Sequence, residues 1–142
     1  PGKRSTRLKT EGAFHTYYMV GAARRFREVL EAADFHAPAL KVLSNYTGSF
    51  HPQDAAGIKA NLFAQLFKPV LWHANLLQAV DGGCDTIIEF GGGIGKGTSA
   101  AEKNPNLAGI VKKTFRRHQT PPTYHAVINC DTLTTTAGNF GS

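Results

Sequence analysis

The chain has 142 residues, of which 42% are hydrophobic and 18% are charged, and its formal net charge is +6. This length and balance indicate one folded domain with a core, and they exclude an intrinsically disordered chain. No apolar run approaches the ~20 residues of a membrane helix, and no apolar segment follows the basic N-terminus as in a secretion signal, so we expect a cytoplasmic protein without a membrane partner.

The positive charge is concentrated in two clusters, Lys3, Arg4, Arg7 and Lys9, and Lys112, Lys113, Arg116 and Arg117. The first cluster has no interleaved aromatic residue, the second has only Phe115, and neither has a nucleic-acid motif, so we interpret both as solvated surface and expect no nucleic-acid partner. Cys84 and Cys130 are too few for a disulfide scaffold and lack metal-ligand spacing. We expect two buried free thiols and no metal.

In the first half of the chain, residues 1–10 are polar and basic and form a predicted lead-in segment. Apolar residues then recur at helical spacing over residues 17–33, which predicts an amphipathic helix with Thr16 as its N-cap. Pro38 makes residues 35–39 a connector. Residues 40–44 read as a short buried strand and residues 46–52 as a loop, and a second helix is predicted over residues 53–67, before Pro69.

A third helix is predicted from Trp72 to the glycine pair Gly82-Gly83. Residues 84–90 predict a buried strand that leads into glycines. The pattern then weakens: residues 98–103 suggest a helical turn, 107–115 a helix or a strand, 124–133 a strand and 134–142 a flexible tail. Helices that alternate with buried strands in this way indicate an α/β fold.

Gly12, Ala13, Phe14 and His15 stand directly before the first predicted helix. Small residues at positions 12 and 13 allow backbone or substrate to approach closely. Histidine titrates near neutral pH, so His15 at a rigid junction could act as a general base. On composition alone, a cap or packing role for His15 is the alternative.

Gly12-Ala13-Phe14-His15, followed by Met19, resembles the histidine motif of the malonyl-CoA:acyl carrier protein transacylase family, which includes the acyltransferases of polyketide synthases. Three later segments resemble family motifs in the same order, namely Ser44-Asn45-Tyr46-Thr47-Gly48, Gln65 to Trp72, and Glu89-Phe90-Gly91-Gly92-Gly93. The resemblance implies an α/β-hydrolase-like acyltransferase core of parallel strands and flanking helices. Residues 11–133 would form its carboxyl-terminal portion.

The resemblance also implies roles for individual residues. His15 would be the catalytic base, and the backbone carbonyl of Gln65 would accept the other ring N–H of His15. Without the resemblance, Gln65 would be read as a helix-surface residue and Asn45 as a turn residue. The implied substrate-binding residues are Phe14, Asn45, Gly91 and Gly93. Phe14 resembles the malonyl-selective form of the motif, whereas Gly92 replaces the usual proline.

The reaction implied is transfer of a malonyl group from coenzyme A to the phosphopantetheine thiol of an acyl carrier protein, through an acyl-serine. The coenzyme A thioester is then a substrate, and no resident cofactor is expected. The family's serine motif, Gly-His-Ser-x-Gly, is absent, and so is its ferredoxin-like subdomain. Ser99 lies in the nearest segment in form, but it follows the histidine and reverses the family order.

We therefore expect the chain to supply the histidine half of a larger enzyme, with an amino-terminal half carrying the serine, and to be inactive alone. One alternative is a non-catalytic module of the same fold that docks a carrier protein or a synthase. A second is phosphate binding by the glycine-rich segment 93–98. The P-loop pattern is disfavoured because Phe90 replaces its first glycine and Gly97 its hydroxyl residue.

Overall fold

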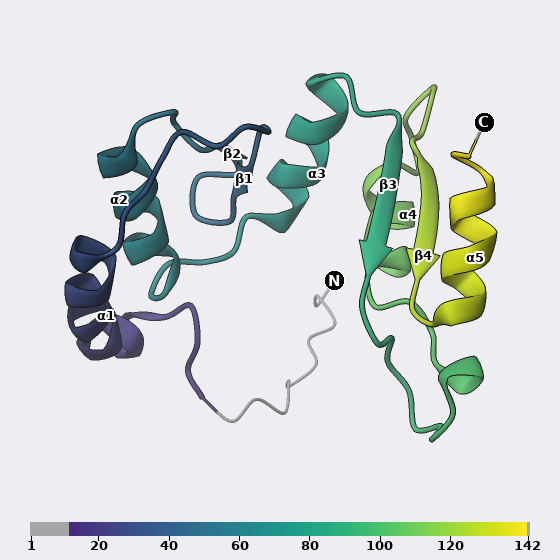
Figure 1. Cartoon of the computed structure of the whole chain (residues 1–142), viewed down its shortest axis with the longest axis horizontal. Helices are drawn as coiled ribbons and strands as arrows, with labels where there is room; N and C mark the ends of the chain where they lie inside the picture. The colour runs from purple at the N-terminus through teal and green to yellow at the C-terminus, as the bar shows by residue number, and fades with distance from the viewer. Residues whose placement is uncertain (1–11, 142) are drawn as a thin grey trace, which may run out of the picture. The chain divides into compact units, whose positions relative to one another are not determined.

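The computed structural model describes residues 12–141. These residues form two compact units, one ending at Asn75 and one beginning at Leu76 (Figure 1). The predicted lead-in segment, residues 1–10, and Glu11 lie outside the described residues. Each unit is described below by itself.

The first unit is built around two packed helices. Its elements, in chain order, are η1 (Tyr17–Met19), α1 (Val20–Ala32), β1 (Leu43–Ser44), β2 (Ser49–Phe50), α2 (Ala55–Gln65) and the start of α3 (Trp72–Asp81). The helix α1 buries Ala23 and Leu30, and α2 buries Ile58 and Ala64. Ala23, Leu30 and Ile58 are positions of the predicted apolar faces, whereas Ala64 is not, and the helices expected over residues 17–33 and 53–67 are confirmed.

The starts of the first two helices differ in how they are capped. The carboxylate of Asp54 accepts a hydrogen bond from the backbone N–H of Gly57 at 2.7 Å, so Asp54 caps α2. The cap predicted at Thr16 is wrong in detail. Thr16 precedes η1, but its hydroxyl donates to the carbonyl of Ala13 at 2.6 Å and accepts no N–H from the helix.

The buried strand predicted over residues 40–44 is also wrong. Only Leu43 and Ser44 are extended, as β1, which pairs antiparallel with β2 in a short hairpin. Leu40 and Val42 are 79% and 47% exposed. An apolar run predicts burial only where another element covers it, and within the described residues Leu40 is left largely uncovered and Val42 only partly covered.

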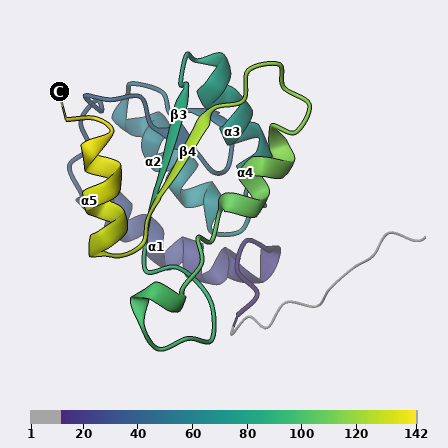
Figure 2. The same ribbon diagram turned by 90° about the vertical axis from the view of Figure 1, so that its right-hand side faces the viewer.

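The second unit contains a parallel pair of strands. Its elements after α3 are β3 (Thr86–Phe90), η2 (Ala100–Glu102), α4 (Ala108–Thr114), β4 (Thr123–Val127) and α5 (Cys130–Gly138). The strands β3 and β4 pair in register from Thr86–Thr123 to Phe90–Val127. Figure 2 shows α4 and α5 on opposite sides of this sheet. Two parallel strands must be joined by a crossover connection, and here that connection contains α4. Residues 107–115, for which the sequence left helix and strand open, are therefore mainly helical.

Three expectations for the second unit are corrected. The strand β3 is not buried, because it has one paired neighbour among the described residues, and Ile88 and Phe90 are 36% and 71% exposed. Cys84 and Cys130 are exposed free thiols.

The third correction concerns the strand predicted over residues 124–133 and the predicted tail, since β4 ends at Val127 and residues 130–138 form α5. This helix is started by a reciprocal capping box between Asn129 and Thr132, and it buries Thr136. Among the described residues, none of the helices is long and apolar enough to cross a membrane.

Candidate active site

The side chain of His15 is held by the carboxyl end of α2. The backbone N–H of His15 donates to the carbonyl of Leu66 at 3.1 Å, and His15 Nδ1 lies 2.7 Å from the carbonyl oxygen of Gln65. Carbonyls at a helix end have no partner within the helix, so they are free to accept these bonds. A carbonyl only accepts, so Nδ1 carries the proton, and in the neutral ring Nε2 has the free lone pair.

The backbone at His15 has an unusual conformation, with φ of +60°. This left-handed region is uncommon for residues other than glycine, although histidine is among those that tolerate it better. Such a conformation persists where the surroundings fix it, and it is found frequently at functional sites. The two hydrogen bonds to the end of α2 fix it here, so the ring of His15 points in a defined direction.

Phe14 is 60% exposed and its ring folds back over Gly12. A Cβ atom at position 12 would lie 3.0 Å from Cε2 of the Phe14 ring. A larger residue at Gly12 would therefore displace the ring. Gly12 therefore leaves room for the ring of Phe14, the residue that precedes His15.

Asn45 lies in the turn between β1 and β2 and joins this turn to α3. Its backbone carbonyl accepts the N–H of Leu71 at 2.8 Å, and its Oδ1 accepts from Nδ2 of the buried Asn75 at 3.1 Å. Within the described residues, no hydrogen bond joins Asn45 to His15. The structure therefore gives Asn45 a structural contact, while its predicted substrate role stays a prediction.

Gly91 and Gly93 belong to the second unit, where they follow β3. The N–H of Gly91 donates to the carbonyl of Val127 at 3.1 Å. Gly93 has φ of +66°, and a Cβ atom there would lie 2.8 Å from Cβ of Lys103 and 2.9 Å from the carbonyl oxygen of Asn104. Gly93 is thus required by the backbone, whereas Gly91 has open space around it. Their predicted role in substrate binding remains a prediction.

Glu89 is a residue of the predicted motif to which the sequence assigned no role. It is buried, and the backbone N–H groups of Asn106 and Leu107 donate to its carboxylate oxygens at 2.8 Å each, while the hydroxyl of Tyr124 donates to one of them. Burial alone would raise the pKa of Glu89, but these three hydrogen bonds outweigh it and hold the pKa below its usual range.

The same contact changes Tyr124, whose hydroxyl pKa is raised by burial and by the neighbouring Glu89. The carboxylate of Glu89 thereby joins β3 to the start of α4 and to β4, next to the glycine loop. A charged residue inside an apolar strand was the signal that the sequence offered for this contact.

None of the serines in the described part of the chain is placed as the missing nucleophile. The Ser99 hydroxyl donates to the carboxylate of Glu102 at 2.9 Å, and the Ser44 hydroxyl oxygen accepts the N–H of Thr47 at 3.3 Å. Ser44 is also almost fully buried. Among the described residues, no hydrogen bond joins a serine to a histidine.

Known proteins with a similar sequence include a malonyl transacylase and a polyketide synthase protein. No protein-family model matches. The malonyl CoA-acyl carrier protein transacylase of Bacillus subtilis is 33% identical over 118 residues, which is 83% of this chain and 33% of that protein. NorB, a spectinabilin polyketide synthase protein of Streptomyces orinoci, is 31% identical over 90 residues, 63% of this chain and 4% of that protein.

Solved structures of malonyl transacylases also match this chain. The malonyl CoA-acyl carrier protein transacylase of Clostridium perfringens matches with a TM-score of 0.73 and 26% identity over 94% of this chain and 37% of that one. A structure of a type II polyketide synthase acyl carrier protein in complex with its malonyl-transacylase, PlMCAT:AntF, matches with a TM-score of 0.72 and 25% identity, over 93% of this chain and 38% of that one.

These matches identify the class of protein from its fold, which is the α/β core of an acyltransferase, as predicted. More narrowly, the chain is a homologue of the malonyl-CoA:acyl carrier protein transacylases and of polyketide synthase acyltransferases. It spans about a third of the length of the Bacillus subtilis protein, and this partial coverage fits a carboxyl-terminal part. The resemblance drawn from the sequence motifs is confirmed.

Proposed function

We propose that this chain supplies the histidine-bearing part of a malonyl-type acyltransferase that acts in the cytoplasm. The observation that carries the proposal is the 2.7 Å contact between His15 Nδ1 and the carbonyl of Gln65. It fixes the proton on Nδ1 and leaves Nε2 as a base, the arrangement that a nucleophilic serine needs. In a serine protease triad an aspartate orients the histidine, whereas here a neutral carbonyl does so.

The proposed reaction has two half-reactions. His15 Nε2 takes the proton of a serine hydroxyl while the serine oxygen attacks the thioester carbonyl of malonyl-coenzyme A. The C–S bond then breaks, and the imidazolium gives its proton to the departing coenzyme A thiolate. In the second half, Nε2 takes the proton of the carrier protein's phosphopantetheine thiol, whose sulfur attacks the carbonyl carbon of the acyl-serine. The bond between this carbon and the serine oxygen then breaks, and the imidazolium gives its proton to the serine oxygen.

The serine must come from outside the segment described here. The chain spans about a third of the Bacillus subtilis relative and lacks Gly-His-Ser-x-Gly. We therefore propose that an amino-terminal half with this motif completes the enzyme, either as a companion polypeptide or as part of a longer chain. The 142-residue chain alone is inactive in this proposal, because the covalent step has no nucleophile. No resident cofactor is required.

The test is transfer of radiolabelled malonyl from malonyl-coenzyme A to a holo acyl carrier protein by the assembled enzyme. We expect His15→Ala to lower the rate by roughly 10³-fold or more, as loss of a catalytic base does. His73→Ala is the matched control, because His73 is an exposed histidine on α3. If His15→Ala leaves the rate intact, the chain is instead a non-catalytic docking module for a carrier protein or a synthase.

Substrate selection by Phe14 is a separate prediction. Phe14 directly precedes His15 in the chain, and its exposed ring is expected to exclude the α-methyl branch of methylmalonyl groups. Phe14→Ser in the assembled enzyme should raise the use of methylmalonyl relative to malonyl, by at most the roughly 10- to 200-fold that one methyl group is worth. Competition between the two thioesters measures this ratio, and an unchanged ratio contradicts the assignment.

A further inference from the structure

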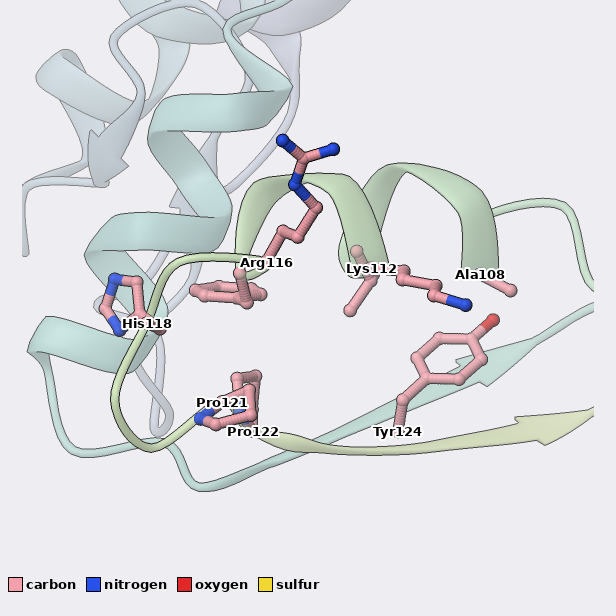
Figure 3. A pocket seen from close by; sticks show the side chains of 9 residues that line it. Ala108, Lys112, Arg116, His118, Pro121, Pro122 and Tyr124 are labelled. Carbon is pink, nitrogen blue, oxygen red and sulfur yellow. The ribbon is translucent and has the colours of Figure 1, made fainter.

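The second unit contains a cavity of about 450 Å³ that is independent of the His15 site. It lies between α4 and the segment that leads into β4, as Figure 3 shows. Its lining residues are Ala108, Val111, Lys112, Phe115, Arg116, His118, Pro121, Pro122 and Tyr124. Cavities of this size and mostly apolar lining are typical of small-molecule sites.

Rings and a buried aliphatic side chain form the walls of the cavity. Val111, on α4, and Phe115, which follows the last residue of this helix, are both buried. The rings of Phe115 and His118 meet edge to face, with centroids 5.2 Å apart and planes at 80°. Two consecutive prolines and Tyr124 form the opposite side. Flat rings on both sides suit a flat apolar group, because aromatic faces and edges pack against one another.

The charge at the mouth of the cavity is positive. Lys112 lines it from α4 and Arg116 from the turn that follows this helix, and none of the lining residues is acidic. Figure 3 shows the amino group of Lys112 on the same side as the Tyr124 hydroxyl, and Arg116 directed outward. Among the described residues, neither cation has a hydrogen bond or an ion pair. The nearby carboxylate of Glu89 is satisfied by two backbone N–H groups and Tyr124.

We propose that this cavity binds an aromatic anion, with its ring between Phe115 and the two prolines and its carboxylate or phosphate group at Lys112. Burial of the ring supplies the apolar part of the binding energy. A charge-assisted hydrogen bond from the unpaired Lys112 supplies the selectivity for an anion. Nothing in this site depends on the acyl transfer reaction, so its test is independent of that proposal.

The test compares 2-naphthoate with the neutral 2-naphthalenemethanol in calorimetric titrations of the assembled enzyme, in which this chain is joined by its amino-terminal half. We expect saturable binding of naphthoate that is about tenfold tighter than binding of the alcohol. The variant Lys112→Glu with Arg116→Glu should weaken naphthoate binding by tenfold or more. The control variant Lys113→Glu with Arg117→Glu has the same change of net charge from adjacent residues that do not line the cavity.

A second variant tests the position of the ring. Ala108→Trp places a large side chain in the cavity and should abolish binding of both compounds, with the fold checked by circular dichroism. Three outcomes overturn the proposal: no saturable binding of naphthoate, equal binding of the alcohol, or equal loss in the two charge-reversed variants. Equal loss would mean that naphthoate is attracted by the net charge of α4 and not by this cavity.

Discussion

The oxygen that holds the His15 ring belongs to the backbone of Gln65, so the amide side chain of Gln65 takes no part in this contact. A backbone contact depends on the path of the chain and not on the identity of the residue. The carbonyl is available because α2 ends at this position. The contact between Gln65 and His15 therefore follows from where the helix stops.

This leads to a prediction for the tautomer of His15. We expect the neutral ring to carry its proton on Nδ1, and we expect Gln65→Ala to leave that tautomer unchanged, because alanine retains the carbonyl and the helix. Two-bond ¹H–¹⁵N spectra of the histidine rings measure the proton's position. A ring that changes to the Nε2–H form in the variant would show that the Gln65 amide is needed after all.

Glu89 makes stability dependent on pH. Its folded-state pKa is lowered from the usual 4.5, so its stabilising contribution is fully present above pH 4.5 and is lost as pH falls through the folded-state value. At pH 7, Glu89→Gln should lower the free energy of unfolding by about 1–3 kcal/mol, the range for hydrogen bonds to a buried charged group. At low pH the difference between wild type and variant should shrink.

Urea denaturation at pH 7 and pH 3 measures both values. Asp81→Asn is the control, because Asp81 is an exposed carboxylate at the end of α3, and removing it should change little at either pH. A difference between wild type and Glu89→Gln that stays constant with pH would mean that the charge of Glu89 does not contribute.

At the scale of elements, the hairpin between β1 and β2 depends on Gly48. Its φ is +66°, and a Cβ atom there would lie 2.7 Å from Cβ of Ala74, on α3. Gly21, on α1, has no atom within 4 Å of such a Cβ. The two glycines therefore provide a matched pair within one unit.

We expect opposite effects from the two glycine-to-alanine substitutions. Gly48→Ala should destabilise by roughly 2 kcal/mol or more, because the left-handed conformation alone costs about 1–2 kcal/mol and the clash adds to it. Gly21→Ala should stabilise by about 0.5–1 kcal/mol through helix propensity. Thermal unfolding of both variants gives the comparison, and a stable Gly48→Ala protein would show that the hairpin can shift away from α3.

Local pattern was sufficient to predict the three longer helices and the glycine loop, since amphipathic periodicity and Pro or Gly stops are properties of adjacent residues. Burial was harder to predict, because Leu40 and Phe90 look like core residues in sequence but are 79% and 71% exposed in the described part of the chain. The start of α5 was missed because a capping box of Asn129 and Thr132 follows directly on a strand.

In the candidate site too, features set by adjacent residues could be predicted, whereas contacts between distant residues could not. His15 and Gln65 were found through short motifs, and their contact is present in the structure. The network at Glu89 could not be found, because its donors lie 17 to 35 residues further along the chain. The pocket on α4 likewise combines residues from Ala108 to Tyr124, and no motif marks it.

For the molecule as a whole, the main fact is that the chain spans about a third of the Bacillus subtilis relative and contains no Gly-His-Ser-x-Gly. We predict that the native protein contains that motif, in a companion polypeptide or a longer chain. Intact mass of the native material, beside a gel for co-purifying chains, measures this. A lone 15.3 kDa species would exclude catalysis by the proposed mechanism and favour the docking module.

The φ of +60° at His15 also affects how its ring can be removed. Alanine adopts this conformation only at a cost, whereas glycine adopts it freely, so His15→Gly removes the ring and keeps the path of the chain. The site is exposed, so imidazole dissolved in the buffer can reach the space that the ring leaves beside the Gln65 carbonyl. Activity restored by added imidazole would separate the chemistry of the ring from the shape of the backbone that carries it.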